Sequence, residues 1–321
     1  MAGGEDAGLP ICRRRDLDSP GMDHQTVVAE SRAALQATID FGMRKLGAAK
    51  WEPAAGSEAA AELRPGEIKA DGTPWGEDQP RTAYAVANLM MHAVLDNLTA
   101  LRQLLDDRMP VIGPTVVARS AIEIALGPWW LMEPGIGVRA RVCRELVLSL
   151  TSARRAGQLA DEFRATGHDV SEAIEEAAQQ EARVLKRIAD LGIGMPSDGF
   201  RPTIGGQRAP DATHGIAAML RTAMPTSSPG TEVYRTYSAV THGEIYGLMS
   251  FMAPGVSTDG TTILHWHLPP DLLDSTVQLA VTAFREAWRR INKVMDWGKL
   301  EGDLWEIRLG KIYAASARAG G

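Results

Sequence analysis

An arginine, a serine and a histidine occur at helical spacing in the segment YRTYSAVTHGE, residues 234–244. Arg235, Ser238 and His242 are three and four residues apart, which places them on one face of a helix. An arginine and a histidine on one face can bind a phosphate or a carboxylate, stabilise negative charge and transfer a proton. This face is therefore a candidate catalytic site.

A second helix supplies polar partners at matching spacing. Arg119 and Glu123 are four residues apart in the segment VVARSAIEIAL, and their neighbours are almost all apolar. A buried arginine–glutamate pair is costly, so it is expected to orient, specify or bind something. We expect this helix to face the segment that begins at Tyr234, with a polar cluster between them. Arg119, Glu123 and Tyr234 are candidate ligand-binding residues of that cluster.

Trp129 and Trp130 directly follow the Arg119–Glu123 segment. Most tryptophans of a helical protein belong to its core. This pair is nevertheless placed to line a pocket beside the polar cluster, so we include Trp130 among the candidate ligand-binding residues.

Two histidine patterns raise the question of a metal. His92 and Asp96 are four residues apart, a spacing that can orient an imidazole, supply two metal ligands or form a surface pair. His265 and His267 alternate on an extended segment and point to one face, but the sequence shows no third ligand. We therefore expect no metal and no cofactor, and we count His92 and Asp96 as candidate ligand-binding residues.

Apolar periodicity and helix breakers predict an all-α bundle of roughly seven to nine helices. Residues 1–25 are rich in glycine, proline and charge, which is typical of a disordered tail, and residues 26–321 are predicted to form one helical domain. Glycines and prolines interrupt residues 48–80 and predict a long loop. Residues 261–268 alternate and predict a short strand. The helix that carries the candidate catalytic face is expected to run from about residue 232 to residue 252.

Composition excludes several classes of protein. The 321 residues carry a formal net charge of -6, which argues against a generic nucleic-acid binder. Two cysteines are too few for a disulfide framework or a cysteine zinc site. The N-terminal residues lack the pattern of a signal peptide, and no run of about 18 apolar residues occurs. We expect a cytoplasmic protein that has no membrane partner.

Two groups of residues resemble a known class of helical proteins. RxxxE at 119–123, WWLMEP at 129–134 and RxR at 139–141 form the first group, and YRxxSxxxHG at 234–243 with the YGL that follows forms the second. Together they resemble a group of uncharacterised all-helical proteins common in actinobacteria. That group is similar to the HEPN-like helical families, and the resemblance covers about residues 83–250.

In HEPN-like nucleases an arginine, four to six further residues and a histidine on one helix form the active site. These enzymes cut RNA without a metal and are often dimers. Six residues separate Arg235 from His242 here, while Thr236 stands where such nucleases usually have asparagine or aspartate. The resemblance implies a HEPN-like core, RNA as the partner and a homodimer, with His242, Arg235 and Ser238 in the catalytic roles.

Three functions remain open at this point. The first is a metal-independent ribonuclease or toxin with His242 as general base and Arg235 stabilising the phosphorane. The second is a small-molecule-binding protein or biosynthetic enzyme, in which Arg119, Glu123, Arg235 and His242 orient a ligand and residues 48–80 act as a lid. In the third, the polar cluster is only a structural brace.

Overall fold

Apolar side chains recur at helical spacing along most of the chain, and the computed structural model folds them into eleven helices within the residues it describes. Helices α2 (Glu58–Glu62) and α9 (Ile245–Met249) are single turns of five residues, so nine of the eleven are longer. The prediction of an all-α bundle is confirmed. The described residues are 23–48, 51–64, 66–105, 109–194, 196–197, 199, 201–223, 229–256 and 262–319.

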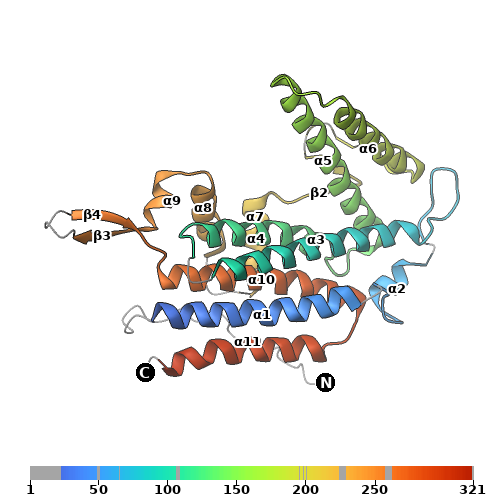
Figure 1. Cartoon of the computed structure of the whole chain (residues 1–321). Coiled ribbons are helices and arrows are strands. Elements are labelled where there is room, and N and C mark those ends of the chain that lie inside the picture. The colour runs from blue at the N-terminus through green and yellow to red at the C-terminus, as the bar shows by residue number, and fades with distance from the viewer. Residues whose placement is uncertain are drawn as a thin grey trace.

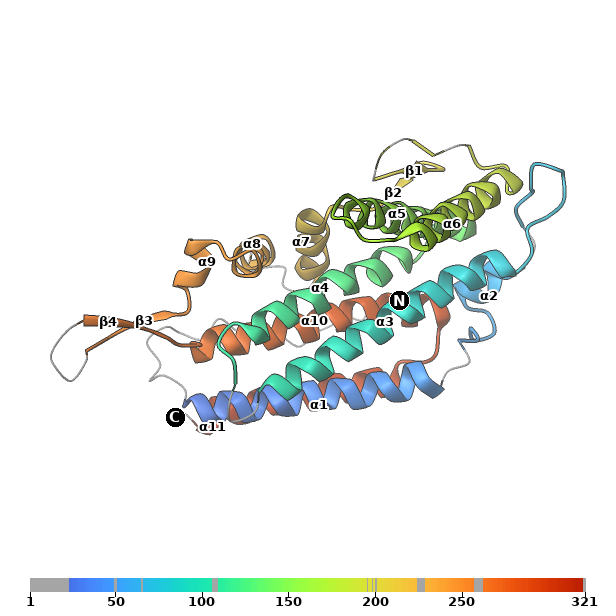
Figure 2. The same cartoon turned by 45° about the horizontal axis from the view of Figure 1, so that its top comes forward.

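Five long helices lie side by side and form the bundle (Figure 1, Figure 2). They are α1 (His24–Ala48), α3 (Asp78–Leu104), α4 (Gly113–Leu131), α10 (Pro270–Met295) and α11 (Leu300–Ala319). A side chain at Gly42 of α1 would lie within 2.5 Å of Leu95 and 3.0 Å of Phe284, both of which are fully buried. The glycine therefore lets α1 approach α3 and α10 closely. A buried leucine such as Leu95 contributes roughly 2 kcal/mol to this packing.

A helical hairpin projects from one end of the bundle (Figure 1). It consists of α5 (Gly137–Ala165) and α6 (Ser171–Asp190), and the short strands β1 (Thr203–Ile204) and β2 (Gln207–Arg208) pack against α5. The first half of α5 is buried, whereas Leu159 and Phe163 near its end are exposed.

The segment between β2 and α10 lies outside the five-helix bundle, beside α4. Helices α7 (Ala212–Ala223) and α8 (Pro229–Thr241) contact each other, and both contact α4 (Figure 2). After α9, strands β3 (Met252–Val256) and β4 (Thr262–Trp266) form an antiparallel hairpin. The strand predicted near residues 261–268 is thereby confirmed. None of the helices in the described ranges has the length and apolar character needed to cross a membrane.

The expectation of one continuous helix from residue 232 to residue 252 is wrong, because the chain turns at Gly243. This residue has a φ of 69°, in the left-handed region that favours glycine. The amide of Gly243 donates to the carbonyl of Val240, and the amide of Glu244 donates to the carbonyl of Ala239. This pair of bonds closes a helix end in a Schellman motif. Helix α8 therefore ends just before His242.

Two other predicted segments differ in detail. The expected loop at residues 48–80 contains α2, which Ser57 caps by accepting a hydrogen bond from the amide of Ala60, and it also includes the start of α3. The predicted tail at residues 1–25 falls outside the described residues up to residue 22, and α1 begins at His24.

A buried arginine connects α2, α4 and α5. Arg141 is fully buried, and its Nε donates to Oε2 of Glu62 at 2.8 Å while its Nη2 donates to Oε1 of Glu58 at 2.8 Å. Its Nη1 donates to the carbonyl of Leu131, at the end of α4. The hydroxyl of Tyr84 on α3 donates to Glu62, and burial, followed by the charge of Glu62, raises the pKa of Tyr84. Such a network is stable only when all of its charges are satisfied.

Replacing Arg141 with glutamine should destabilise the fold by about 3–5 kcal/mol, because Glu62 would keep its charge in a buried place without its main counter-ion. The free energy of unfolding in urea measures this loss. Arg164→Gln is the matched control, since its ion pair with Asp161 is exposed and its removal should cost less than about 1 kcal/mol. Equal stability of the two variants would contradict the role assigned to the network.

Candidate functional site

The polar cluster between α4 and α8 is built from Arg119, Glu123 and Tyr234. Nε of Arg119 donates to Oε1 of Glu123 at 2.7 Å, and the Tyr234 hydroxyl donates to the same oxygen at 3.0 Å. The Arg119 guanidinium carbon lies 5.5 Å from the centre of the Tyr234 ring, within the range of a cation–π contact. The expected contact between these two helices is confirmed.

Burial shapes the electrostatics of this cluster. The Arg119 side chain is 12% exposed and that of Glu123 is 35% exposed. Burial, followed by the negative charge of Glu123, raises the pKa of Tyr234. Nη1 of Arg119 is buried and has no hydrogen-bond partner within the described residues. The polar groups of the cluster therefore bond mainly to one another, and Nη1 of Arg119 is the donor without a partner among the described residues.

Arg235 and His242 do not join that cluster. Both side chains are exposed and Ser238 is half-buried, and no hydrogen bond or ion pair of the Arg235 or His242 side chain occurs within the described residues. The expectation that Arg119, Glu123, Arg235 and His242 orient one ligand stays a prediction.

Tyr237 explains this orientation of α8. Its side chain is 2% exposed, and its hydroxyl lies 2.9 Å from the Oγ1 of Thr276 on α10. A helix that turns Tyr237 inward necessarily turns the opposite arc outward. Arg235 and His242 lie on that outer arc, where two helical turns, about 10 Å, separate their Cα atoms.

His242 directly follows the last residue of α8. Its backbone amide donates to the carbonyl of Ser238 at 3.0 Å, while the carbonyl of Arg235 accepts a bond from the Tyr246 hydroxyl at 3.3 Å. This face thus carries a guanidinium, a hydroxyl and an imidazole.

Trp130 lies at the other end of α4 from the cluster. Eleven residues of helix, about 16 Å, separate it from Arg119. Its ring faces the Arg144 guanidinium, whose carbon is 5.0 Å from the ring centre. The prediction that Trp130 lines a pocket beside the cluster is wrong, because α4 continues to Leu131 and carries Trp130 away.

His92 and Asp96 share a face of α3 but do not form a bonded pair. His92 is half-buried and Asp96 is exposed, and no hydrogen bond joins them. Within the described ranges, no group of three or more histidine, cysteine, aspartate or glutamate side chains is arranged to hold a metal ion.

Three arginines that sequence analysis did not single out for this role gather at the C-terminal end of α4. Arg141, Arg144 and Arg290 donate to the carbonyls of Leu131, Trp130 and Trp129, respectively. These carbonyls have no partner inside the helix, and they carry its negative dipole end. The last turn of α4 has no basic residue of its own, and these cations come from α5 and α10 instead.

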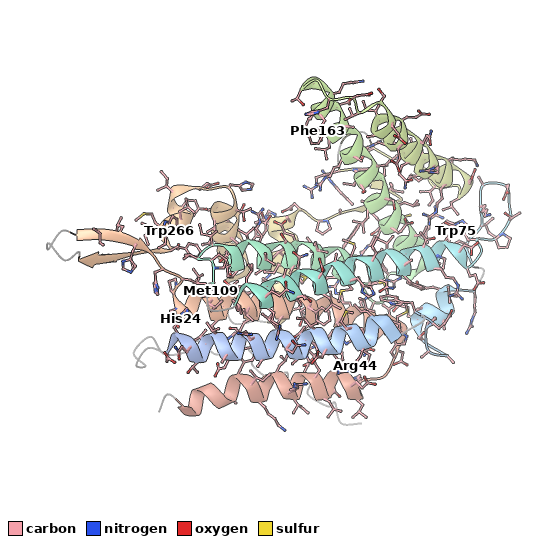
Figure 3. The ribbon with its side chains drawn as sticks, viewed as in Figure 1. His24, Arg44, Trp75, Met109, Phe163 and Trp266 are labelled. Atoms are coloured by element: carbon pink, nitrogen blue, oxygen red, sulfur yellow. The ribbon has the colours of Figure 1, made fainter. Side chains whose placement is uncertain are left out.

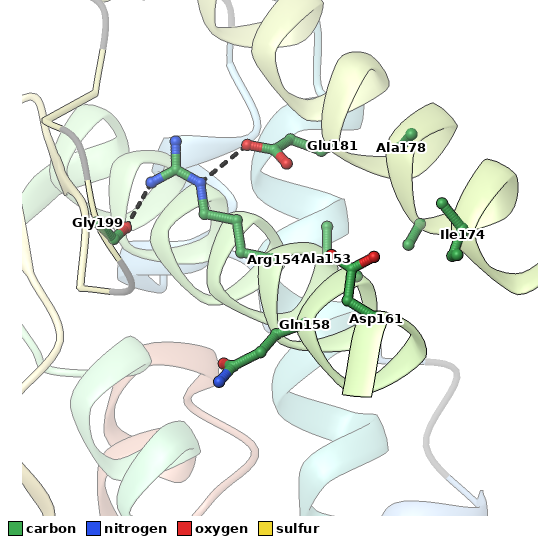
Figure 4. Close-up of a pocket in the computed structure, with 10 residues that line it drawn as sticks. Ala153, Arg154, Gln158, Asp161, Ile174, Ala178, Glu181 and Gly199 are labelled. Atoms are coloured by element: carbon green, nitrogen blue, oxygen red, sulfur yellow. Dashed lines mark hydrogen bonds and ion pairs between the residues drawn. The ribbon is translucent and has the colours of Figure 1, made fainter. Parts of the chain in front are cut away.

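A cleft of about 470 Å³ lies between α5 and α6 (Figure 4). Arg154 crosses one side of it, with its Nε donating to Glu181 at 2.9 Å and its Nη1 donating to the carbonyl of Gly199. Gln158 and Asp161 also line this cleft. None of the residues predicted for catalysis or ligand binding lines it, so it gives no support to the small-molecule hypothesis as formulated from the sequence.

Comparison of the chain with protein-family models, with curated proteins and with solved structures found no match. The resemblance to the actinobacterial group and to HEPN-like helices therefore stays a prediction. A function must be inferred from the chemistry available on α4 and α8.

The anchoring of α8 by Tyr237 predicts a loss of stability in alkali. Burial raises the pKa of Tyr237 above its ordinary value of 10.0, so the fold favours the neutral phenol. This contribution is complete below pH 10 and is lost as the pH rises above it, at about 1.4 kcal/mol per unit. Between about pH 9 and pH 11, the free energy of unfolding should therefore fall by about 1.4 kcal/mol more in the native chain than in Tyr237→Phe. Equal pH dependence of the two proteins in urea unfolding would contradict this.

Proposed function

We propose that the chain is a metal-independent ribonuclease of the HEPN-like kind, whose catalytic face is the outer arc of α8. The observation that carries this proposal is that the side chains of Arg235 and His242 are exposed on one face and form no hydrogen bond or ion pair within the described residues. Both groups are thus available to a substrate. Arg119, Glu123 and Tyr234 are bonded to one another instead and act as the brace that holds α8 on α4.

The three residues can supply what RNA cleavage requires. His242 accepts the proton of a ribose 2′-hydroxyl, and the resulting oxygen attacks the adjacent phosphorus. Arg235 stabilises the charge of the phosphorane, and Ser238, between the two, donates a hydrogen bond. The bond to the 5′-oxygen breaks, a 2′,3′-cyclic phosphate forms, the departing oxygen takes a proton from water, and His242 releases its proton to the solvent. No step needs a metal ion.

The charge of the chain places a condition on this proposal. A formal net charge of -6 gives no general attraction for RNA, so binding must depend on local cations. One copy presents Arg235 and His242, and a homodimer would present the pair twice. We therefore include a homodimer in the proposal, with RNA as its partner.

Cleavage of total RNA by the purified protein in EDTA, followed on a gel, tests the proposal. Because the general base is lost, His242→Ala should reduce the rate by about 10²–10⁴-fold. The matched control is His214→Ala, since His214 is also an exposed helical histidine but lies on α7. It should cleave like the native chain.

The brace and the catalytic face can be separated with a further variant. Glu123→Gln should lower the free energy of unfolding by about 1–3 kcal/mol, because it weakens the charge-assisted bond of the largely buried Arg119. His242→Ala should leave that free energy within about 0.5 kcal/mol. If RNA is not cleaved by the native chain, or is cleaved equally by His242→Ala, the proposed function is wrong.

A further inference from the structure

The β3–β4 hairpin extends beyond the end of the bundle and exposes apolar side chains (Figure 1, Figure 3). Ile263 is 44% exposed, Leu264 is 56% exposed and Trp266 is 50% exposed. Because successive residues of a strand point to opposite faces, β4 is exposed on both faces of the hairpin. An isolated two-stranded hairpin is only marginally stable in water. These features indicate that the hairpin has a partner.

The hydrogen-bond pattern shows which backbone groups face outward. The amide of His267 donates to the carbonyl of Phe251 at 2.7 Å, so these two residues lie opposite each other at a hydrogen-bonded position. Positions alternate along an antiparallel pair. Pro254 and Leu264 are opposite each other three residues further on, at a non-hydrogen-bonded position. Their backbone groups therefore point away from the hairpin, toward its two outer edges.

The two edges differ in how they are protected. On β3, Met252, Pro254 and Val256 face outward, and the central one, Pro254, has no amide hydrogen and so interrupts pairing along this edge. On β4, Leu264 and Trp266 direct both amide and carbonyl groups outward. Edge strands of monomeric proteins usually carry a charge or a proline as protection. Between Glu244 and Asp271 the sequence has one acidic residue, Asp259, and neither lysine nor arginine.

We infer that β4 pairs with β4 of a second copy of this chain, which joins the two hairpins into one four-stranded antiparallel sheet. A two-fold axis places β4 of one copy antiparallel to β4 of the other, so the outward amides and carbonyls of each strand meet their partners on the other. The absence of lysine and arginine avoids repulsion between like charges across the axis. Pairing satisfies the outward groups of Leu264 and Trp266 and brings together the apolar side chains on both faces. Ile245 and Met249 on α9, shortly before β3, are exposed as well.

This interface rests on the homodimer included in the proposed function, but its evidence comes from the hairpin alone. Light scattering after size-exclusion chromatography of the full chain tests it. The native chain should elute with twice the mass of one copy, and Leu264→Pro should elute with the mass of one. That substitution removes an outward amide, as Pro254 does on β3, and leaves the bonds within the hairpin intact. Leu264→Val is the matched control, and it should remain a dimer.

Hydrogen exchange of the peptide that contains β4 provides a second measurement that needs no variant. Exchange should be slow at concentrations where the dimer forms, and it should become faster on dilution. A native chain that is monomeric at all concentrations, or a Leu264→Pro variant that is still dimeric, overturns the inference, as does fast exchange throughout. RNA cleavage is assayed separately. A monomer that cleaves RNA overturns the interface and the homodimer but leaves the proposed activity, and a dimer that does not cleave overturns the proposed activity alone.

Discussion

The burial of the Arg141 charge is the constraint on which the arrangement of the helices depends. Removing a guanidinium from water costs several kcal/mol, and only well-placed anions and carbonyls compensate for that cost. Here the compensating groups are Glu58 and Glu62 of α2 and the carbonyl of Leu131 at the end of α4. Because these groups converge on one side chain of α5, the three helices cannot shift independently. Tyr84 ties α3 to the same network through Glu62.

Helix α4 carries that constraint to the candidate site. Its C-terminal end is held by arginines from α5 and α10, and two of these also lie over the faces of Trp129 and Trp130. The other half of α4 presents Arg119 and Glu123 to Tyr234 of α8. Polar contacts at both ends of one helix thus connect a rigid bundle to the helix that carries the catalytic candidates.

The sequence predicted those features that depend on local spacing. Helical periodicity predicted the all-α class, alternation predicted β4, and the four-residue spacing of Arg119 and Glu123 predicted a pair that faces Tyr234. The break of α8 was missed because it depends on one backbone angle, the positive φ of Gly243, inside an otherwise continuous helical pattern. The partners of Arg141 were missed because 79 residues separate it from Glu62.

The orientation of Arg235 and His242 could not be predicted from their own spacing, since any face of a helix repeats in the same way. Their orientation depends on which of the two arcs of α8 makes contacts with the rest of the protein. The hydroxyl of Tyr237 is hydrogen-bonded to Thr276 on α10, and that of Tyr234 is hydrogen-bonded to Glu123 on α4, so the outer arc faces away from both helices. The contacts that hold α8 are made by its inner arc, so substitutions on the outer arc should have little effect on folding. After α8 the chain continues through α9 into the β3–β4 hairpin. The exposed face of α8 and the exposed strand β4 therefore belong to one segment of the chain, which the tyrosines of α8 hold on the bundle.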